Sequence, residues 1–483
     1  MKFKRFKKNS VFFGLLAISG SLILSACSNN VATVGESNTD RILVGLADPD
    51  NPRWVNARKE IVNSLLQYKD KEQKSYKVTS NITKSQVEQT NFLQTQLSLS
   101  PIPKAVVVGA NDDGAATIAN EAKAKNIPFI AYDRLINSSD QYYFYAAFDN
   151  AKVGELQGLW LASKILSKLT NGVVFQSKEQ LQTWIKKGEE SGKHGTTGSM
   201  GGDTMGMSPM DMKTPHLDQL EEQYIYAIAG APTDNNAKFF YSGAMEVLKI
   251  ITENNILKNK VKIVGGTETF DKAAIANWNY SAAQTKVAGF LSSPEFAKTK
   301  AFLAPNDGMA LAVINALEAN KNDAKKYYIT GQDSNSENLK RISDGYQLMT
   351  IAKSDKWNAK VVAIWADYMI KNNPTLSQAG SKAIAEKILA EINKDATITK
   401  FKADLDKLSP KPAASSTSDN KNQVAQHTMA NTFVTLDTTT YKPTNSVGGE
   451  FAAVNTFLLK PILVDGANIT TYNQIFSDST PKQ

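Results

Sequence analysis

Charged and amide side chains follow several of the apolar segments in this sequence. They are Arg53 and Trp54, Asp133 and Arg134, Asp234, Asn235 and Asn236, Asn306 and Asp307, and Gln332 and Asp333. Carboxylates and amides beside cationic donors can both accept hydrogen bonds from hydroxyl groups and donate to them. The rings of Trp54 and Trp278 could cover the apolar C–H face of a pyranose. This combination is suited to noncovalent binding of a hydroxyl-rich solute such as a sugar.

Each of these residues, taken alone, also has a structural explanation. An Asp or Asn after a strand is more often a helix N-cap or a turn former than a ligand contact. The recurrence of such residues in both halves of the chain favours a binding site.

A glycosidase is the catalytic alternative, because Asp133, Asp234 and Asp333 could supply an acid/base pair. Their Arg, Asn and Gln neighbours instead favour the holding of hydroxyl groups. The three histidines, His194, His216 and His427, all fall in irregular segments. No histidine-assisted nucleophile can then be assembled, and we expect no enzyme activity and no catalytic residue, cofactor or metal.

Short apolar runs that alternate with amphipathic helical patterns must position these side chains. Strands are predicted at residues 42–47, 76–78, 105–108 and 129–132, and helices near 52–68, 85–97 and 114–124. The same alternation restarts with strands at 224–229, 261–264, 300–303 and 327–330 and a helix near 235–252. Strands that alternate with helices predict parallel sheets covered on both faces. The fold class is therefore α/β, with two doubly wound lobes and a ligand site between them, where the carboxyl ends of the strands lie.

The N-terminus has the pattern of an export signal. Five basic residues fall within positions 2–8, an apolar run follows over 11–24, and Leu24-Ser25-Ala26-Cys27 closes the segment. Such a segment is shorter than a membrane-spanning helix. The last four residues resemble a bacterial lipobox, which implies lipidation of Cys27. Cys27 is the only cysteine of the chain, so no internal disulfide competes for it.

We therefore predict a signal peptide over residues 1–26 and a flexible tether over 27–40. Without the five basic residues of the signal, the net charge of +8 falls to about +3, too little for a nucleic-acid footprint. No other apolar stretch reaches membrane-spanning length. The protein is expected on the outer face of the plasma membrane, attached by lipid.

Two segments interrupt the alternation. Residues 172–222, rich in Gly, Ser and Met, are predicted as an irregular insertion, and 408–456 as a long loop or linker. Methionines of the first segment could ligate Cu(I) beside His194 and His216. The loose spacing, without cysteine, instead favours a surface loop. The methionines in question are Met205, Met207, Met210 and Met212.

Several strings of residues resemble the D-xylose-binding proteins of bacterial ABC importers, which are type I periplasmic sugar-binding proteins. The resemblance covers most of residues 41–371 and the C-terminal strand. The strings are Asp133-Arg134-Leu135-Ile136, the segment 149–157, Pro232–Lys238, Asn306-Asp307, Gly331-Gln332-Asp333, Met349–Lys353 and Leu459-Lys460-Pro461-Ile462. It implies a monosaccharide ligand, permease and ATPase partners, and a monomer whose lobes close around a hinge. A nucleoside or other hydroxylated solute, or a surface sensor or adhesin that has lost transport, is the alternative.

The resemblance also implies three chain crossings, near 148–150, 349–353 and 459–463. The N-terminal lobe would comprise 41–148 and 351–407, and the C-terminal lobe 149–350 and 457–483. The implied sugar contacts are Arg53, Trp54, Asp133, Arg134, Asp234, Asn236, Asn306, Asp333 and Lys353. Trp278 is the expected stacking residue of the second lobe, with Phe270 as the alternative. One departure is Lys353-Ser354, where the family has Lys-Pro.

Overall fold

The structure is a computed structural model that describes residues 31–170, 172, 174–193, 216–408, 433–445 and 447–477. The predicted signal peptide at 1–26, the lipidation site Cys27 and the methionines of the insertion lie outside the described residues. Across the described ranges, no helix combines the length and the apolar character needed to span a bilayer.

An eight-stranded sheet forms the N-terminal lobe, with its strands in the order β1-β3-β2-β4-β5-β6-β13-β12. The strands from β3 to β13 pair in parallel, and the edge strands β1 and β12 pair antiparallel. The strands are β1 (Ala32–Val34), β2 (Arg41–Ala47), β3 (Lys77–Thr83), β4 (Ala105–Val108), β5 (Phe129–Tyr132), β6 (Phe144–Phe148), β12 (Val434–Asp437) and β13 (Asn455–Leu459).

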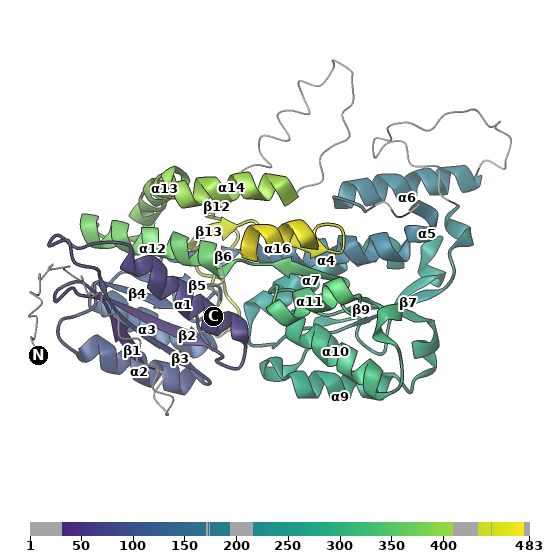
Figure 1. The fold of residues 1–483 in the computed structure, drawn as a ribbon, viewed down its shortest axis with the longest axis horizontal. Coiled ribbons are helices and arrows are strands. Elements are labelled where there is room, and N and C mark those ends of the chain that lie inside the picture. The colour runs from purple at the N-terminus through teal and green to yellow at the C-terminus, as the bar shows by residue number, and fades with distance from the viewer. Residues whose placement is uncertain are drawn as a thin grey trace, which may run out of the picture. The chain divides into compact units, whose positions relative to one another are not determined.

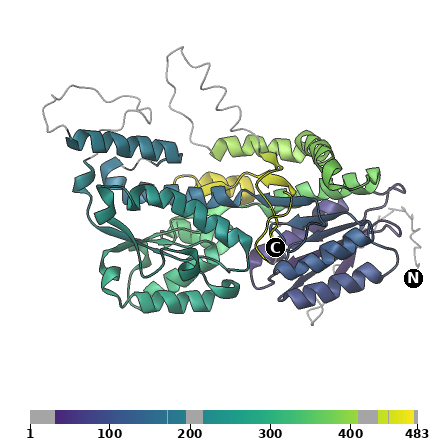
Figure 2. The ribbon, with the colours of Figure 1, turned by 180° about the vertical axis from the view of Figure 1, so that it is seen from behind.

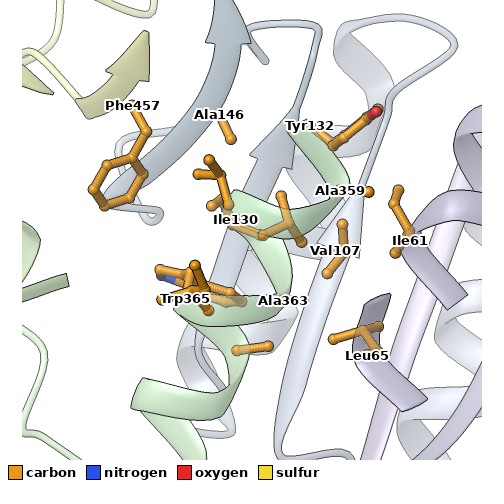
Figure 3. Packing of buried hydrophobic residues seen from close by; sticks show 14 of the residues in the cluster. Ile61, Leu65, Val107, Ile130, Tyr132, Ala146, Ala359, Ala363, Trp365 and Phe457 are labelled. Atoms are coloured by element: carbon orange, nitrogen blue, oxygen red, sulfur yellow. The ribbon is translucent and has the colours of Figure 1, made fainter. Parts of the chain in front are cut away.

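Helices cover both faces of this sheet (Figures 1 and 2). Along β2, Ile42, Val44 and Leu46 pack into one core with α1 and α12, whereas Leu43 packs into another with α2 and α3. This alternation follows from the two-residue period of a strand. Figure 3 shows the first core, where Ile61 and Leu65 of α1 face side chains of the strands and of α12. The helices of the lobe are α1 (Pro52–Leu66), α2 (Gln86–Ser98), α3 (Ala116–Ala124), α12 (Asp355–Asn372), α13 (Gln378–Lys394) and α14 (Ala396–Leu408).

A four-stranded parallel sheet in the order β10-β9-β7-β8 forms the C-terminal lobe. Its strands are β7 (Gln223–Ala227), β8 (Val261–Val264), β9 (Thr299–Leu303) and β10 (Tyr328–Ile329). Helices α4 and α7 share a core on one face, and α9 and α10 share a core on the other. The helices are α4 (Asn150–Ile165), α5 (Ser167–Thr170), α6 (Lys178–Lys193), α7 (Asn235–Thr252), α8 (Phe270–Ala273), α9 (Tyr280–Phe290), α10 (Asp307–Ala319) and α11 (Ser336–Asp344).

Three connections join the lobes, at the positions that the sequence predicts. The first runs from β6 into α4 through Asp149. The second runs from β11 (Met349–Ala352) into α12, and the third from β13 into β14 (Ile462–Asp465). Strands β11 and β14 pair antiparallel as a separate two-stranded ladder. The predicted α/β class with two doubly wound lobes is confirmed.

Two of the predicted irregular regions contain regular structure. Within the predicted tether, β1 pairs with β3, and the amides of Glu36 and Ser37 donate to the carbonyl of Ser75. Within the predicted insertion, α6 places Leu181, Trp184 and Ile185 in the core of the C-terminal lobe. These three residues have helical spacing, and the Gly- and Met-rich residues beyond them obscured that pattern.

The end of the chain also differs from the prediction. Residues 433–459, predicted as loop and then as C-terminal lobe, contain β12 and β13 of the N-terminal lobe's sheet. The strand β13 pairs along its whole length with β6 and places Phe457 and Leu459 in the first core. The side chain of Asn455 adds hydrogen bonds to the carbonyl of Tyr143 and to Ser381 Oγ. Only from β14 onward does the chain lie beside β11, followed by the last helix α16 (Ile469–Ser477).

Candidate functional site

One cavity is lined by side chains from both lobes. The lining residues are Asp48, Asn51, Arg53, Trp54, Asp133, Arg134, Asp234, Asn236, Phe240, Trp278, Asn306, Gln332, Asp333 and Lys353. All ten residues predicted from the sequence are among them. The free volume between these side chains is about 20 Å³, roughly the space of one water molecule. In this conformation the side chains of the two lobes therefore fill the site themselves.

A buried ion pair forms the centre of the N-terminal lobe's half. Arg53 Nη1 and Nη2 donate to the two carboxylate oxygens of Asp133 at 2.8 and 2.6 Å. Both side chains are almost completely buried. Burial by itself would raise the pKa of Asp133, but the charges of Arg53 and Lys353 outweigh it and hold that pKa well below its ordinary value. These two hydrogen bonds together fix the orientation of the guanidinium relative to the carboxylate.

Two further carboxylates face the same guanidinium. Arg53 Nε lies 3.4 Å from Asp355 Oδ1 and 3.8 Å from Asp333 Oδ1. Lys353 Nζ lies 3.8 Å from both Asp133 Oδ1 and Asp333 Oδ1. Burial raises the pKa of Asp355 to about 6 despite the nearby Arg53. Burial and the like charge of Arg53 lower the pKa of Lys353.

Three polar atoms of this centre have no hydrogen-bond partner among the described residues. They are Arg53 Nε, Asp333 Oδ1 and Gln332 Oε1, and each is buried. Buried polar atoms in folded proteins normally have a partner, and each exception calls for an explanation. This donor and these two acceptors belong to residues that line the cavity, and they match the hydrogen-bonding capacity of hydroxyl groups.

Trp54 lies beneath the two arginines. The guanidinium carbons of Arg53 and Arg134 lie over its ring, 5.4 and 5.1 Å from the ring centroid. On another side the ring lies against Gly109, where a Cβ would come within 2.6 Å of it. The indole therefore orients both cations, in addition to the predicted role of covering a sugar face.

In the C-terminal lobe, the cavity residues Asp234 and Asn306 are also helix N-caps. The carboxylate of Asp234 accepts from the amide of Asn236 at 2.9 Å at the start of α7. The side-chain oxygen of Asn306 accepts from the amide of Met309 at 2.9 Å at the start of α10. Each helix begins where a parallel strand ends, so one side chain both caps the helix and faces the site. The capping and binding explanations are compatible here.

Hydrogen bonds and an ion pair connect the two halves. Arg134 Nε lies 3.0 Å from Asp234 Oδ2, an oxygen that also accepts from Trp278 Nε1 at 3.1 Å. Asn236 Nδ2 donates to the carbonyl of Asp133 at 2.7 Å. The ring of Trp278 lies against Gly230, where any Cβ would collide with it. Phe270, the alternative to Trp278, does not line this cavity.

Comparisons with known proteins identify the chain's family. Residues 42–190 and 209–374 match the periplasmic binding protein domain, which is well over half of the chain. This chain belongs to the periplasmic binding protein family. It is 37% identical over 340 residues to a 46 kDa surface antigen of Mesomycoplasma hyopneumoniae, covering 67% of this chain and 72% of the antigen.

Other relatives of this periplasmic binding protein carry names that state a ligand. A multiple sugar-binding periplasmic protein of Azospirillum brasilense is 25% identical over 390 residues, covering 78% of this chain and 91% of that protein. A D-xylose-binding periplasmic protein of Escherichia coli is 26% identical over 336 residues, covering 69% and 79%. The fold matches an ABC transporter solute-binding protein from Clostridium phytofermentans, solved with β-D-glucose, with a TM-score of 0.58 at 22% identity, covering 92% of this chain and 98% of that one.

Some of the binding protein's cavity residues were not predicted from the sequence. Asp48 and Asn51 follow β2 in the same way that the predicted residues follow their strands, so the same signal could have found them. Phe240 belongs to the apolar face of α7 and resembles an ordinary core residue in the sequence. Asp355, which pairs with Arg53 but does not line the cavity, begins α12 and resembles a residue that favours the start of a helix. Within the residues that the structure describes, no group of His, Cys, Asp and Glu side chains is arranged to hold a metal ion.

Proposed function

We propose that this periplasmic binding protein is the substrate-binding lipoprotein of an ABC-type sugar importer and binds an uncharged, xylose-like monosaccharide. The observation that carries the proposal is the cavity's polar inventory. Arg53, Arg134 and Lys353 each already lie within 4 Å of a carboxylate, so an anionic ligand would have to compete with these carboxylates for the cations. Hydroxyl groups can satisfy the unpartnered donor and acceptors without breaking these ion pairs.

The named relatives support the same class of ligand. Two of them are called sugar-binding proteins, and a structural neighbour was solved with glucose as an ABC transporter component. What they support is a monosaccharide as the ligand and a permease and an ATPase as partners.

Binding requires the lobes to separate and close again. A free volume of about 20 Å³ cannot hold a sugar ring. Entry of the sugar must therefore break the contacts between Arg134 and Asp234 and between Asn236 and the carbonyl of Asp133. A sugar that bridges both lobes then stabilises a closed form, which the permease recognises.

The contacts of Asp133 and Asp234 argue against these two carboxylates as a glycosidase's acid/base pair. A general acid needs a pKa raised toward neutrality, whereas Arg53 and Lys353 hold the pKa of Asp133 well below its ordinary value. Asp234 is engaged by Arg134, by Trp278 and by the helix that it caps. These engagements suit a residue that holds hydroxyl groups. We infer that the protein is a binding component and has no catalytic activity.

The proposal includes a lipid anchor on Cys27 and a location on the outer face of the plasma membrane. Metabolic labelling with an alkyne analogue of palmitate tests the anchor. The parent should incorporate the label and the Cys27→Ala variant should not. Equal labelling of both proteins would contradict the anchor and leave sugar binding untouched.

A surface role without transport is the second candidate. The observation that favours it is the 37% identity to a surface antigen, which exceeds the 25 and 26% identity to the two sugar-binding relatives. A surface protein that has lost transport could still bind sugar. The discriminating test is whether the sugar-loaded protein stimulates ATP hydrolysis by its permease complex in proteoliposomes.

A thermal-shift screen of protein beginning at Ser28 tests the ligand class. Pentoses, hexoses and nucleosides are each added in excess, because a ligand of the native state raises the apparent stability by mass action. We expect a shift with D-xylose or a close relative and none with sugar acids. A shift with nucleosides alone would replace sugar as the ligand.

A further inference from the structure

A strained turn carries the cavity residue Asp333. Asp333 and the next residue, Ser334, have φ values of 97° and 52°, a region that residues other than glycine rarely adopt. Backbone in such a conformation persists only where surrounding contacts hold it. Two backbone amides hold this turn. The amide of Asp333 donates to the carbonyl of Ile351 at 2.9 Å, and the amide of Ser334 donates to Thr350 Oγ1 at 3.2 Å.

The hydroxyl of Ser334 connects this turn to Tyr472, near the end of the chain. Ser334 Oγ donates to the carbonyl of Asp333 at 2.6 Å. Tyr472 Oη of α16 lies 3.1 Å from Ser334 Oγ. Since the hydroxyl proton of Ser334 is already used, Tyr472 must be the donor. The two bonds form a chain from Tyr472 through Ser334 to Asp333, in which each bond strengthens the other.

Tyr472 is itself held firmly. Its side chain is buried and its ring stacks on Phe476 at 4.4 Å. The ring of Phe476 contacts Phe401 of α14, in the N-terminal lobe, at 5.7 Å. Helix α16 therefore contacts α14 of one lobe and the turn at Asp333 of the other.

We propose that Tyr472 is a positioning residue for the sugar site, and the proposal rests on the proposed function. Its hydroxyl holds the Asp333–Ser334 turn, and the turn points the carboxylate of Asp333 at Arg53 and Lys353. Tyr472 does not line the cavity. It acts through Ser334 and Asp333 and makes no contact with the ligand.

Hydrogen exchange in the absence of sugar tests the turn directly. In Tyr472→Phe, which keeps the ring and removes only the hydroxyl, amide exchange should rise in the peptide that contains residues 331–336. Tyr76→Phe is the matched control, because Tyr76 is also buried and its hydroxyl donates to Asp367 at 2.7 Å, in the other lobe. That control should leave exchange at 331–336 unchanged.

Calorimetric titration with D-xylose and D-glucose tests the consequence for binding. Tyr472→Phe should lower the affinity for the sugar about fivefold to tenfold, the effect of one net hydrogen bond. Tyr76→Phe should leave the affinity unchanged. Ser334→Ala should weaken binding at least as much, and the double variant Tyr472→Phe/Ser334→Ala no further, because both changes break one chain of bonds.

The outcomes separate the two proposals. If the parent binds neither sugar but Tyr472→Phe still loosens the turn, the positioning role stands and the proposed ligand fails. If Tyr472→Phe matches Tyr76→Phe in exchange at 331–336 and in sugar affinity, Tyr472 serves only overall stability and the positioning role is wrong.

Discussion

The two halves of the cavity hold their polar side chains in place in different ways. In the N-terminal lobe, Arg53, Asp133 and Asp355 fix one another through buried charge pairs. In the C-terminal lobe, Asp234 and Asn306 are fixed by the backbone amides of the helices that they cap. The first arrangement depends on every charged member being present. In the second, each residue depends on its own helix.

This difference determines what a substitution should do. Removing one member of a buried ion pair leaves its partner charged and desolvated, which destabilises the whole fold. Removing an N-cap costs little stability, so its effect should be seen mainly in ligand affinity. The lobes can therefore be told apart by comparing the loss of stability with the loss of binding.

Asp133→Asn should give the largest loss of stability. Asn keeps the shape of Asp and tolerates the φ of 61° at this position, so the variant isolates the loss of charge. We expect the free energy of unfolding to fall by about 3–5 kcal/mol and D-xylose binding to be lost. Urea unfolding monitored by tryptophan fluorescence measures the first, and titration calorimetry the second.

The control is an exposed ion pair of the same lobe. Asp50 lies 3.0 Å from Lys84, and both side chains are largely in solvent. Asp50→Asn should change stability by less than about 1 kcal/mol. If Asp133→Asn were no more costly than Asp50→Asn, the charge pairs would not be what holds the N-terminal half together.

Asp355→Asn should change how stability depends on pH. Burial raises the pKa of Asp355 from 3.8 to about 6 in the folded state. The folded protein therefore binds this proton more tightly than the unfolded chain. The resulting stabilisation is fully present below about pH 4 and is lost as pH rises through 6, on the order of 3 kcal/mol. The variant lacks this contribution, so its free energy of unfolding should fall less than that of the parent between pH 4 and 7.

Urea unfolding at several pH values measures the difference. Asp344→Asn is the control, because that side chain is exposed at the end of α11. Identical pH profiles for the parent and Asp355→Asn would mean that this carboxylate is not constrained by its buried surroundings.

Asn306→Ala tests the C-terminal half. Loss of the cap on α10 should cost about 1 kcal/mol of stability, and loss of the amide in the cavity should weaken sugar binding about fivefold to tenfold. Ser377→Ala is matched, because Ser377 caps α13 through the amide of Gly380 at 3.1 Å and does not line the cavity. It should lose similar stability and keep the parent's affinity. If both variants had the same affinity for the sugar, Asn306 would not be a ligand contact.

Much of this arrangement can be predicted from the sequence, for a physical reason. Buried parallel strands such as β4 are continuous apolar runs, and the next residues must lie at the carboxyl edge of the sheet. Asp133, Asp234, Asn306 and Asp333 could be placed in one cavity from that rule and the family resemblance. The ion pair between Arg53 and Asp133 could not be predicted from the sequence, because it depends on how α1 packs against β5.

The segments predicted wrongly are those whose structure depends on distant partners. The strand β1 is a short edge whose backbone bonds to β3, and its three residues carry little pattern. The strand β13 joins the N-terminal lobe through its parallel ladder with β6. It follows a long stretch of sequence without a regular pattern, so the sheet that it enters could not be predicted. Tyr472 illustrates the same limit, because no local pattern connects it to Ser334.

Ser354→Pro, at the crossing that joins the two halves, should give the smallest effect and raise stability. Ser354 has a φ of −69°, makes no side-chain cap and, in the described part of the chain, has no partner for its amide. Proline fits such a position and reduces the freedom of the unfolded chain, so we expect a gain of about 0.4–1 kcal/mol in urea unfolding. Ser377→Pro is the contrast, because a φ of −140° and the cap on Gly380 are incompatible with proline. If Ser354→Pro were as destabilising as Ser377→Pro, the second crossing would need a backbone freedom that its geometry does not indicate. If Ser354→Pro raised stability but weakened sugar binding, closure of the lobes would require backbone freedom at the second crossing. That crossing would then be part of the binding mechanism, together with the two halves of the cavity.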